Sequence, residues 1–181
     1  MALPPISTDR LVLREPTVAD AADVLVFRGD AEVQRYNDDP LQSLAECEAF
    51  VEYLAAETAA GLRRHWALEL DGRVIGLMGL HSWKPGHRRA ELGYDLSRAH
   101  WGRGYAGEAG RAVLRFGFTA MRLHRIQAYT IADNDRSVRL LTGLGFTREG
   151  TLRECSLEDD GRYHDSVVFG LLRPQWAAAT A

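Results

Sequence analysis

The sequence is poor in cysteine and has no long apolar run. Its two cysteines, Cys47 and Cys155, form no Cys-x-x-Cys pair and have no histidine at a zinc-like spacing. Zinc sites and disulfide frameworks need several such residues at fixed spacings, so we expect reduced thiols and no metal. No apolar run could cross a bilayer, and residues 1–9 lack both the basic and the apolar part of a signal peptide. We therefore expect a cytoplasmic protein with no membrane partner.

The sequence also lacks an excess of charge of either sign. Lys and Arg number 22 and Asp and Glu number 25, so the formal net charge is -3 at pH 7. A protein that binds nucleic acid along its phosphates usually carries a basic face. We therefore expect no direct nucleic-acid binding. A monomer and a homodimer both remain open.

Length and composition are typical of one globular unit. A chain of 181 residues with 46% hydrophobic and 26% charged residues can bury a normal core. No repeat, low-complexity tract or linker divides it. We expect a single domain over residues 1–181, with its core over roughly 7–176 and a frayed Ala-rich tail at 177–181.

Hydrophobic periodicity predicts alternating strands and helices. Apolar residues that alternate with polar ones indicate half-buried strands, and apolar residues three and four apart indicate helices with one buried face. Strands are expected over residues 10–14, 65–70, 73–80, 90–96, 126–131, 149–157 and 163–172. Helices are expected over 17–27, 43–61, 105–121 and 133–144, with a broken one over 28–37.

The order of these elements predicts an α/β fold of the α+β kind. Asp71-Gly72 between two apolar runs indicates a tight hairpin, because both turn positions need positive φ. Strand, helix and strand from Glu91 onward imply one parallel crossover. We expect a mixed, mostly antiparallel central sheet of about six to seven strands, flanked by about four helices.

The stretch from His100 to Gly107 has the layout of an anion site, because Gly102 and Gly104 lead into a predicted helix. Glycine lets the backbone approach a ligand, and the first helical turn offers unpaired N–H groups. A pyrophosphate would suit it. The stretch also satisfies the Gly-x-Gly-x-x-Gly pattern of dinucleotide-binding folds. However, five residues separate it from the preceding strand, and the acidic residue Asp133 comes later than that fingerprint requires, so a nicotinamide-dependent oxidoreductase is disfavoured.

A second pattern fits this stretch better. Trp101-x-x-Gly104-x-Ala106 resembles the Arg/Gln-x-x-Gly-x-Gly/Ala signature of the GCN5-related N-acetyltransferases (GNAT), whose turn binds the pyrophosphate of acetyl-CoA. Residues 134–146 resemble the second motif helix of that family, which lies beside the pantetheine and the thioester. Residues 8–14 and 160–165 resemble its Rim-type branch, which acetylates N-terminal amines of ribosomal proteins. The resemblance covers roughly residues 7–176 in the right order.

The resemblance implies a set of contacts with acetyl-CoA. They come from the backbone of the strand before the turn, the turn itself and the start of the second motif helix: Leu92, Tyr94, Leu96, Trp101, Gly102, Arg103, Gly104, Tyr105, Ala106, Gly107, Asn134 and Ser137. A backbone N–H of residues 92–96 would polarise the thioester carbonyl if that strand diverges from the strand at 126–131. Trp101 departs from the signature and removes one phosphate contact. Arg103 would pair with a phosphate, whereas Arg136 and Arg139 read as a solvated helix face.

The resemblance also implies three catalytic residues. Glu91 takes the family's position for the base, acting directly or through a water, although it could instead be a surface residue paired with Arg88 and Arg89. Asn134 would bind the pantetheine, cap the helix, or do both. Leu141 stands where many members have a tyrosine that protonates the thiolate. Ser137 is the remaining hydroxyl for that role, with solvent as the alternative.

The sequence says less about the acceptor of the acetyl group than about acetyl-CoA. Tyr163 and His164 would line its pocket, or else pack behind a hairpin turn. At pH 7 roughly a tenth of an N-terminal α-amine with a pKa near 8 is neutral, and the neutral fraction of a lysine side chain is far smaller. An α-amine therefore needs less help from a base to lose its proton. We expect acetyl transfer to a primary amine by direct attack, with a ribosomal protein N-terminus indicated by the branch. A small-molecule amine, a free amino acid and a non-catalytic acyl-CoA-binding module are the alternatives.

Overall fold

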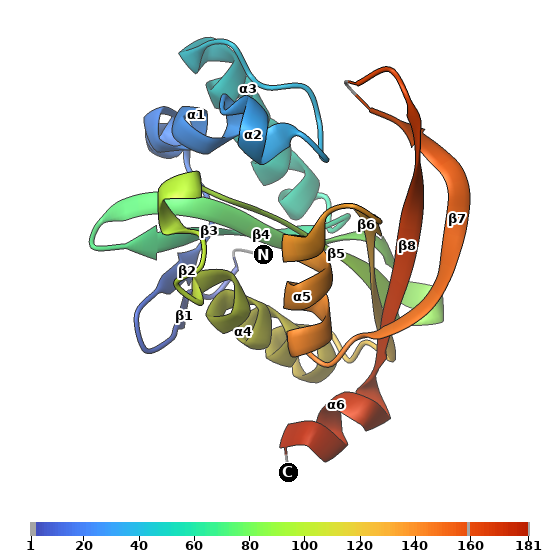
Figure 1. Ribbon diagram of the computed structural model, residues 1–181. Helices are drawn as coiled ribbons and strands as arrows, with labels where there is room; N and C mark the ends of the chain where they lie inside the picture. Colours follow the sequence, from blue (N-terminus) through green and yellow to red (C-terminus); the bar gives the residue numbers. More distant parts are fainter. Residues whose placement is uncertain (1–2, 159, 181) are drawn as a thin grey trace.

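The computed structural model describes residues 3–158 and 160–180 (Figure 1). Its strands form one sheet in the order β1-β2-β3-β4-β5-β6-β8-β7. Every neighbouring pair is antiparallel except β5 and β6. The strands are β1 (Ile6–Ser7), β2 (Val12–Arg14), β3 (Arg64–Leu70), β4 (Arg73–Lys84), β5 (Arg89–Leu96), β6 (Arg125–Ile131), β7 (Thr147–Leu157) and β8 (Tyr163–Leu172).

Helices cover both faces of the sheet (Figure 1). They are α1 (Ala21–Arg28), α2 (Ala31–Gln34), α3 (Leu44–Ala59), α4 (Tyr105–Thr119), α5 (Asp135–Gly143) and α6 (Arg173–Thr180). One apolar core lies between α1, α3 and the sheet, and a larger one lies between the sheet and the helices α4 and α5. Within the described residues, no helix is long and apolar enough to span a membrane.

The predicted fold class is confirmed, and the element counts are corrected. The sheet has eight strands rather than six to seven, because residues 6–14 form a small hairpin in place of one strand. A two-residue strand is too short to produce an alternating pattern. The tail predicted to fray at 177–181 is helical to Thr180, since Trp176 of α6 stacks on Phe118 at 5.2 Å between ring centroids. Asp159, in the predicted turn at 159–161, lies outside the described residues.

Two local predictions are confirmed by backbone geometry. Asp71 and Gly72 both have positive φ, 50° and 77°, and join β3 to β4 as a tight hairpin. Ser43 begins α3, where its hydroxyl accepts a hydrogen bond from the backbone N–H of Glu46 at 3.2 Å. These turns and caps are specified by residues close in sequence, which is why the pattern alone located them.

The sheet opens at its one parallel junction. β5 and β6 pair only from Arg89–Arg125 to Glu91–Gln127. Beyond Glu91, β5 stays paired with β4 up to Leu96, whereas β6 follows β8. The two strands therefore diverge, and the backbone groups of residues 92–96 that face β6 have no strand partner within the described chain.

Candidate active site

A cavity of about 450 Å³, here called cavity 1, lies where β5 and β6 diverge. Its walls come from β5, the turn before α4, β6, α5 and α2. Eleven of the twelve residues predicted to contact acetyl-CoA line it: Leu92, Tyr94, Leu96, Trp101, Gly102, Gly104, Tyr105, Ala106, Gly107, Asn134 and Ser137. The twelfth, Arg103, is exposed and does not line it, so its phosphate contact stays a prediction.

The turn before α4 has the shape that a pyrophosphate requires. Gly102 and Gly104 have φ values of 71° and 82°, which only glycine adopts freely. Gly104 is the N-cap of α4 and, having no side chain, leaves the first N–H groups of the helix to a ligand. Tyr105, Ala106 and Gly107, the residues of this first turn, line cavity 1 at the positive end of the helix dipole.

The N-terminal hairpin braces this turn. The Glu108 carboxylate, in the first turn of α4, accepts hydrogen bonds from the Thr8 hydroxyl at 2.6 Å and from Arg10 Nε at 2.7 Å. Arg10 also donates to the carbonyl of Arg103 at 3.0 Å. Burial raises the pKa of Glu108, but these donors outweigh it and leave the pKa below its usual value. The Thr8-Asp9-Arg10 motif thus holds the glycine turn in place.

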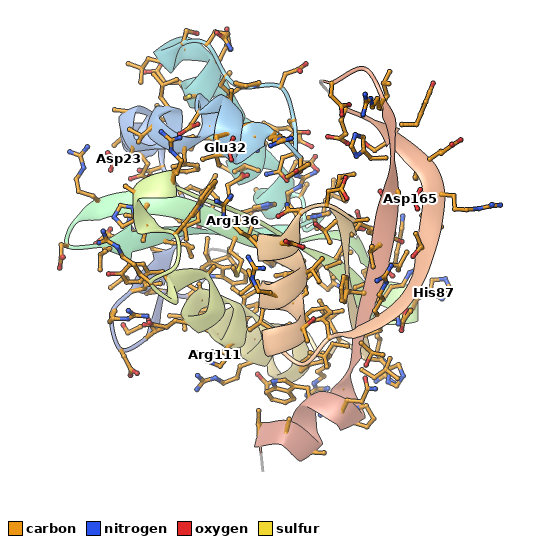
Figure 2. All side chains as sticks on the ribbon, in the orientation of Figure 1. Asp23, Glu32, His87, Arg111, Arg136 and Asp165 are labelled. Carbon is orange, nitrogen blue, oxygen red and sulfur yellow. The ribbon has the colours of Figure 1, made fainter. Side chains whose placement is uncertain are left out.

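Trp101 positions the side chain of Arg136 beside the glycine turn. Trp101 Nε1 donates to the carbonyl of Leu96 at 2.7 Å, and the Arg136 guanidinium lies 4.2 Å above the indole ring. Arg136 also faces Glu32 of α2 across cavity 1, with 3.8 Å between Nη1 and Oε1 (Figure 2). Arg136 is largely exposed, as expected for a solvated helix face, but it also lines cavity 1. The tryptophan that replaces a basic residue holds another one beside the turn.

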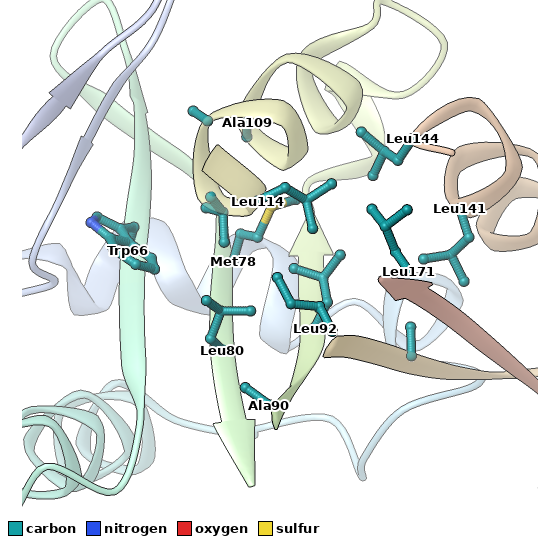
Figure 3. Close-up of a cluster of buried hydrophobic side chains, with 14 of the residues drawn as sticks. Trp66, Met78, Leu80, Ala90, Leu92, Ala109, Leu114, Leu141, Leu144 and Leu171 are labelled. Atoms are coloured by element: carbon teal, nitrogen blue, oxygen red, sulfur yellow. The ribbon is translucent and has the colours of Figure 1, made fainter. Parts of the chain in front are cut away.

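The hydroxyls of Tyr94 and Ser137 meet in cavity 1 at 2.6 Å. Burial raises the pKa of Tyr94 to about 12, although the bond to Ser137 opposes the shift. Asn134 caps α5, where its Oδ1 accepts from the N–H of Ser137 at 3.2 Å. Leu141, in contrast, is fully buried in the core between α4 and the sheet (Figure 3). Tyr94 was predicted to act only through its backbone, so its hydroxyl is an addition to the site.

A second cavity, of about 320 Å³ and here called cavity 2, lies on the other side of β5. It is lined from α1, α3, β3 and β4, and it shares Asn37, Gly93, Tyr94 and Asp95 with cavity 1. Two molecules, one in each cavity, would therefore meet at Gly93 and its neighbours. This is the arrangement that transfer between two bound substrates needs.

Comparison with known proteins identifies the family of this chain. The sequence model described as an acetyltransferase (GNAT) domain matches residues 10–147. The chain belongs to the GNAT acetyltransferase family. It is 34% identical to the uncharacterized N-acetyltransferase YoaA of Bacillus subtilis (strain 168) over 177 residues, covering 95% of this chain and 98% of YoaA. It is therefore an acetyl-CoA-dependent N-acetyltransferase, and the oxidoreductase alternative is excluded.

Two solved structures with different acceptors resemble this GNAT enzyme. The ribosomal L7/L12 α-N-protein acetyltransferase RimL, in complex with coenzyme A, superposes with a TM-score of 0.86 at 20% identity, covering 93% of this chain and 98% of RimL. Spermidine N-acetyltransferase from Vibrio cholerae, in complex with CoA and spermine, superposes with a TM-score of 0.82 at 26% identity, covering 93% and 98%. The likeness to RimL shows the fold alone. The family therefore fixes the reaction and leaves the acceptor open.

A buried charge network forms the wall between the two cavities of this GNAT enzyme. Asp95 of β5 pairs with Arg28 of α1 at 3.0 Å and accepts from Asn37 at 2.8 Å. Arg28 also binds the exposed Asp38 at 2.9 Å. Burial raises the pKa of Asp95, and Arg28 opposes that shift. The network ties α1 and the segment after α2 to β5, a link between residues 67 positions apart that no sequence pattern revealed.

Glu91, the predicted base, lies beside cavity 2 but not in its wall. Among the described residues that line the two cavities, Glu91 is not found. Its carboxylate is half-buried, and its Oε1 lies 3.9 Å from Nε2 of His81. Within the described residues, Glu91 makes its ionic contact with His81 rather than with Arg88 or Arg89. The catalytic role of Glu91 stays a prediction, and its neighbour His81 lines cavity 2.

Tyr163 and His164 lie at the tip of the β7–β8 hairpin. His164 sits between two carboxylates, with Nδ1 at 3.1 Å from Asp133 and Nε2 at 3.0 Å from Asp160. Tyr163 is exposed. Neither residue is among those described as lining the two cavities, so their contact with the acceptor stays a prediction.

We expect the hairpin tip to loosen as pH rises. Hydrogen bonds to Asp160 and Asp133 raise the pKa of His164 above its ordinary value, so the protonated form stabilises the fold. That contribution is complete below the unfolded pKa near 6.5 and is lost as pH rises through the raised value. Hydrogen exchange at the tip, corrected for intrinsic rates, should be faster at about pH 8 than at about pH 6. His164→Gln should remove the difference; an unchanged difference would contradict the assignment.

Proposed function

We propose that this enzyme acetylates the N-terminal α-amine of a protein, by direct attack within a ternary complex. The Rim-type motifs at residues 8–14 and 160–165 favour that acceptor. The likeness in fold to RimL, which is described as an α-N-protein acetyltransferase, agrees with it. A polyamine is the second candidate, because the spermidine enzyme is 26% identical to this chain.

The arrangement of charges in the wall of cavity 2 is the observation that favours a peptide over a polyamine as the acceptor. Its two carboxylates, Asp38 and Asp95, both bind Arg28 already. Arg63 adds a second guanidinium to the same wall, where it packs over the Tyr53 ring and pairs with Glu57 at 3.2 Å. These charges cancel one another, so the wall offers no unpaired carboxylate to the remaining ammonium groups of a polyamine. The carbonyl oxygens of a peptide, in contrast, accept hydrogen bonds from guanidinium groups.

Cavity 1 supplies what the thioester needs. Acetyl-CoA brings the acetyl group in activated form, and the glycine turn with the start of α4 suits its pyrophosphate. Arg136, held above Trp101, adds a cation to the same wall. The N–H groups of residues 92–96 that face the gap between β5 and β6 are the donors proposed to polarise the carbonyl.

The Tyr94–Ser137 pair is proposed to deliver the proton to the departing sulfur. Tyr94→Phe should lower kcat by about 100-fold, because it removes one of the two hydroxyls that pass the proton. Ser137→Ala should cost a similar factor. If the hydroxyls act as one unit, the double variant should lose little more than either single variant. Losses that multiply, or a full kcat in Tyr94→Phe, would assign the proton to solvent.

The choice of acceptor is tested by comparing kcat/KM for matched amines. The panel contains a peptide that begins with alanine, the same peptide with a blocked N-terminus and an internal lysine, free alanine, and spermidine. We expect the free-N-terminus peptide to exceed spermidine by roughly 100-fold, since both carboxylates in the wall of cavity 2 are already paired with Arg28 and cannot bind the extra ammonium groups of the polyamine. A higher kcat/KM for spermidine would overturn the proposed acceptor and leave the acetyltransferase assignment intact.

A further inference from the structure

His81 lies where the two cavities meet. It is on β4 and lines cavity 2. A Cβ added at Gly93 of β5 would lie 2.9 Å from Nε2 of His81, so the imidazole rests directly over this glycine. Gly93 lines both cavities. The Nε2 atom of His81 is therefore next to the one stretch of β5 that both substrates would contact.

The backbone around His81 is irregular, and this irregularity sets the direction of the imidazole ring. The pairing of β4 with β5 is regular up to His81–Glu91 and then shifts before Lys84–Arg89. Ser82, inside this irregularity, has a φ of 49°, which is uncommon for a serine in a strand. Irregularities of this kind are frequent near active sites, where they redirect a side chain. The Ser82 hydroxyl lies 3.2 Å from Nδ1 of His81 and holds the far side of the ring.

We infer that His81 is the general base that takes the proton from the acceptor amine, and that Glu91 is a positioning residue beside it. The register places His81 and Glu91 opposite each other on β4 and β5, with 3.9 Å between Nε2 and Oε1. The inference rests on the proposed function, because it needs an amine in cavity 2. It also gives Glu91 a role that matches its position outside the cavity wall.

Burial, more than the surrounding charges, favours the neutral imidazole of His81. Burial lowers the pKa of His81, Glu91 on β5 opposes that shift, and Arg63 before β3 adds to it. His65 of β3 stacks on His81 with 6.4 Å between ring centroids. Burial holds the pKa of His65 at about 3, so its ring contributes no positive charge. From α1, Arg28 is the other cation in the wall, and α3 contributes Phe50 and Leu54. A neutral imidazole can accept a proton, as a base must.

These groups account for every proton that moves during the acetyl transfer. The acceptor nitrogen forms its bond to the acetyl carbon while the carbon–sulfur bond breaks. His81 Nε2 takes one proton from the nitrogen and later releases it to water. The Tyr94–Ser137 pair gives one proton to sulfur and regains one from water. No oxidant, metal or further reactant is needed.

The test compares pH profiles of kcat/KM for the alanine-starting peptide between about pH 5 and pH 9. His81→Gln should lose about 100-fold or more in kcat/KM and should lose the part of the acidic limb that belongs to the enzyme, while the part set by the peptide's own amine, with a pKa near 8, and the acetyl-CoA affinity stay unchanged. Glu91→Gln should keep most of the activity but move the enzyme's part of the acidic limb to lower pH, because the carboxylate normally raises the pKa of His81. A Glu91→Gln variant that is inactive at every pH would make Glu91 the direct base and overturn the inference.

A second readout needs neither acceptor nor coenzyme. The pKa of His81, followed by NMR of labelled histidine in the free enzyme, should fall in Glu91→Gln by the same amount as the kinetic limb. His87→Gln is the matched control, because His87 lies on an exposed turn away from both cavities (Figure 2). It should leave both readouts unchanged. A wild-type profile in His81→Gln would overturn the inference alone, whereas a wild-type enzyme that acetylates spermidine but no peptide would overturn the proposed acceptor.

Discussion

Replacing Gly104 with valine is expected to lower the affinity for acetyl-CoA by at least about 100-fold. Gly104 has a φ of 82°, a left-handed conformation that a β-branched residue avoids, so valine would force the turn before α4 to relax. The N–H groups at the start of α4 would then no longer converge on the pyrophosphate. Calorimetric titration of the purified variant with acetyl-CoA measures the loss.

Gly86→Val is the matched control for this experiment. Gly86 lies on a turn far from cavity 1, has no positive φ, and a Cβ there would meet nothing within 4 Å. Its substitution should leave acetyl-CoA affinity at the wild-type value. Equal affinities of Gly104→Val and wild type would remove the glycine turn from the coenzyme site.

Arg28→Met is expected to lower the free energy of unfolding by about 3–5 kcal/mol, because it leaves Asp95 buried without its cation. The exposed fractions of the two side chains are 7% and 11%, so solvent cannot replace the lost partner. Urea denaturation followed by circular dichroism measures the change. Asp38→Asn is the control, since Asp38 is exposed and its pairing with the same arginine is worth only about 0–1 kcal/mol.

A double variant separates the charge from the packing. Arg28→Met with Asp95→Leu should recover much of the loss, because an apolar pair of similar size avoids the unpaired buried charge. If Arg28→Met alone proves as stable as wild type, the network does not hold α1 to β5 in the way described.

The parts of the fold that sequence predicted are those set by neighbouring residues. Asp71-Gly72 specifies its hairpin, and Ser43 with Glu46 specifies the start of α3, because each needs contacts only a few positions apart. The glycine turn was found for the same reason. Its glycines and the helix that follows are contiguous, and six of the seven residues predicted there, all except Arg103, line cavity 1. The other five predicted contacts in that cavity came from the family resemblance.

The parts that sequence missed depend on distant residues. Tyr94 and Ser137 are 43 positions apart and meet only because β5 and β6 diverge beneath α5. Arg136 is exposed, as the pattern predicted, but nothing in the pattern places it above Trp101. His81 shares no spacing with another catalytic side chain. Its position depends on Gly93 across the sheet and on the irregularity after it, which only the strand register reveals.

A rapid-quench experiment tests most directly the claim that acetyl passes straight from the thioester to an amine at the junction of the two cavities. The enzyme is mixed with acetyl-CoA at equal concentration, with and without the alanine-starting peptide, and protein, peptide and coenzyme are followed by mass spectrometry. We predict that free coenzyme appears only with the peptide, at the rate of peptide acetylation, and that the protein mass never changes. A burst of free coenzyme without peptide, together with an acetylated Ser137 or Tyr94, would contradict direct transfer.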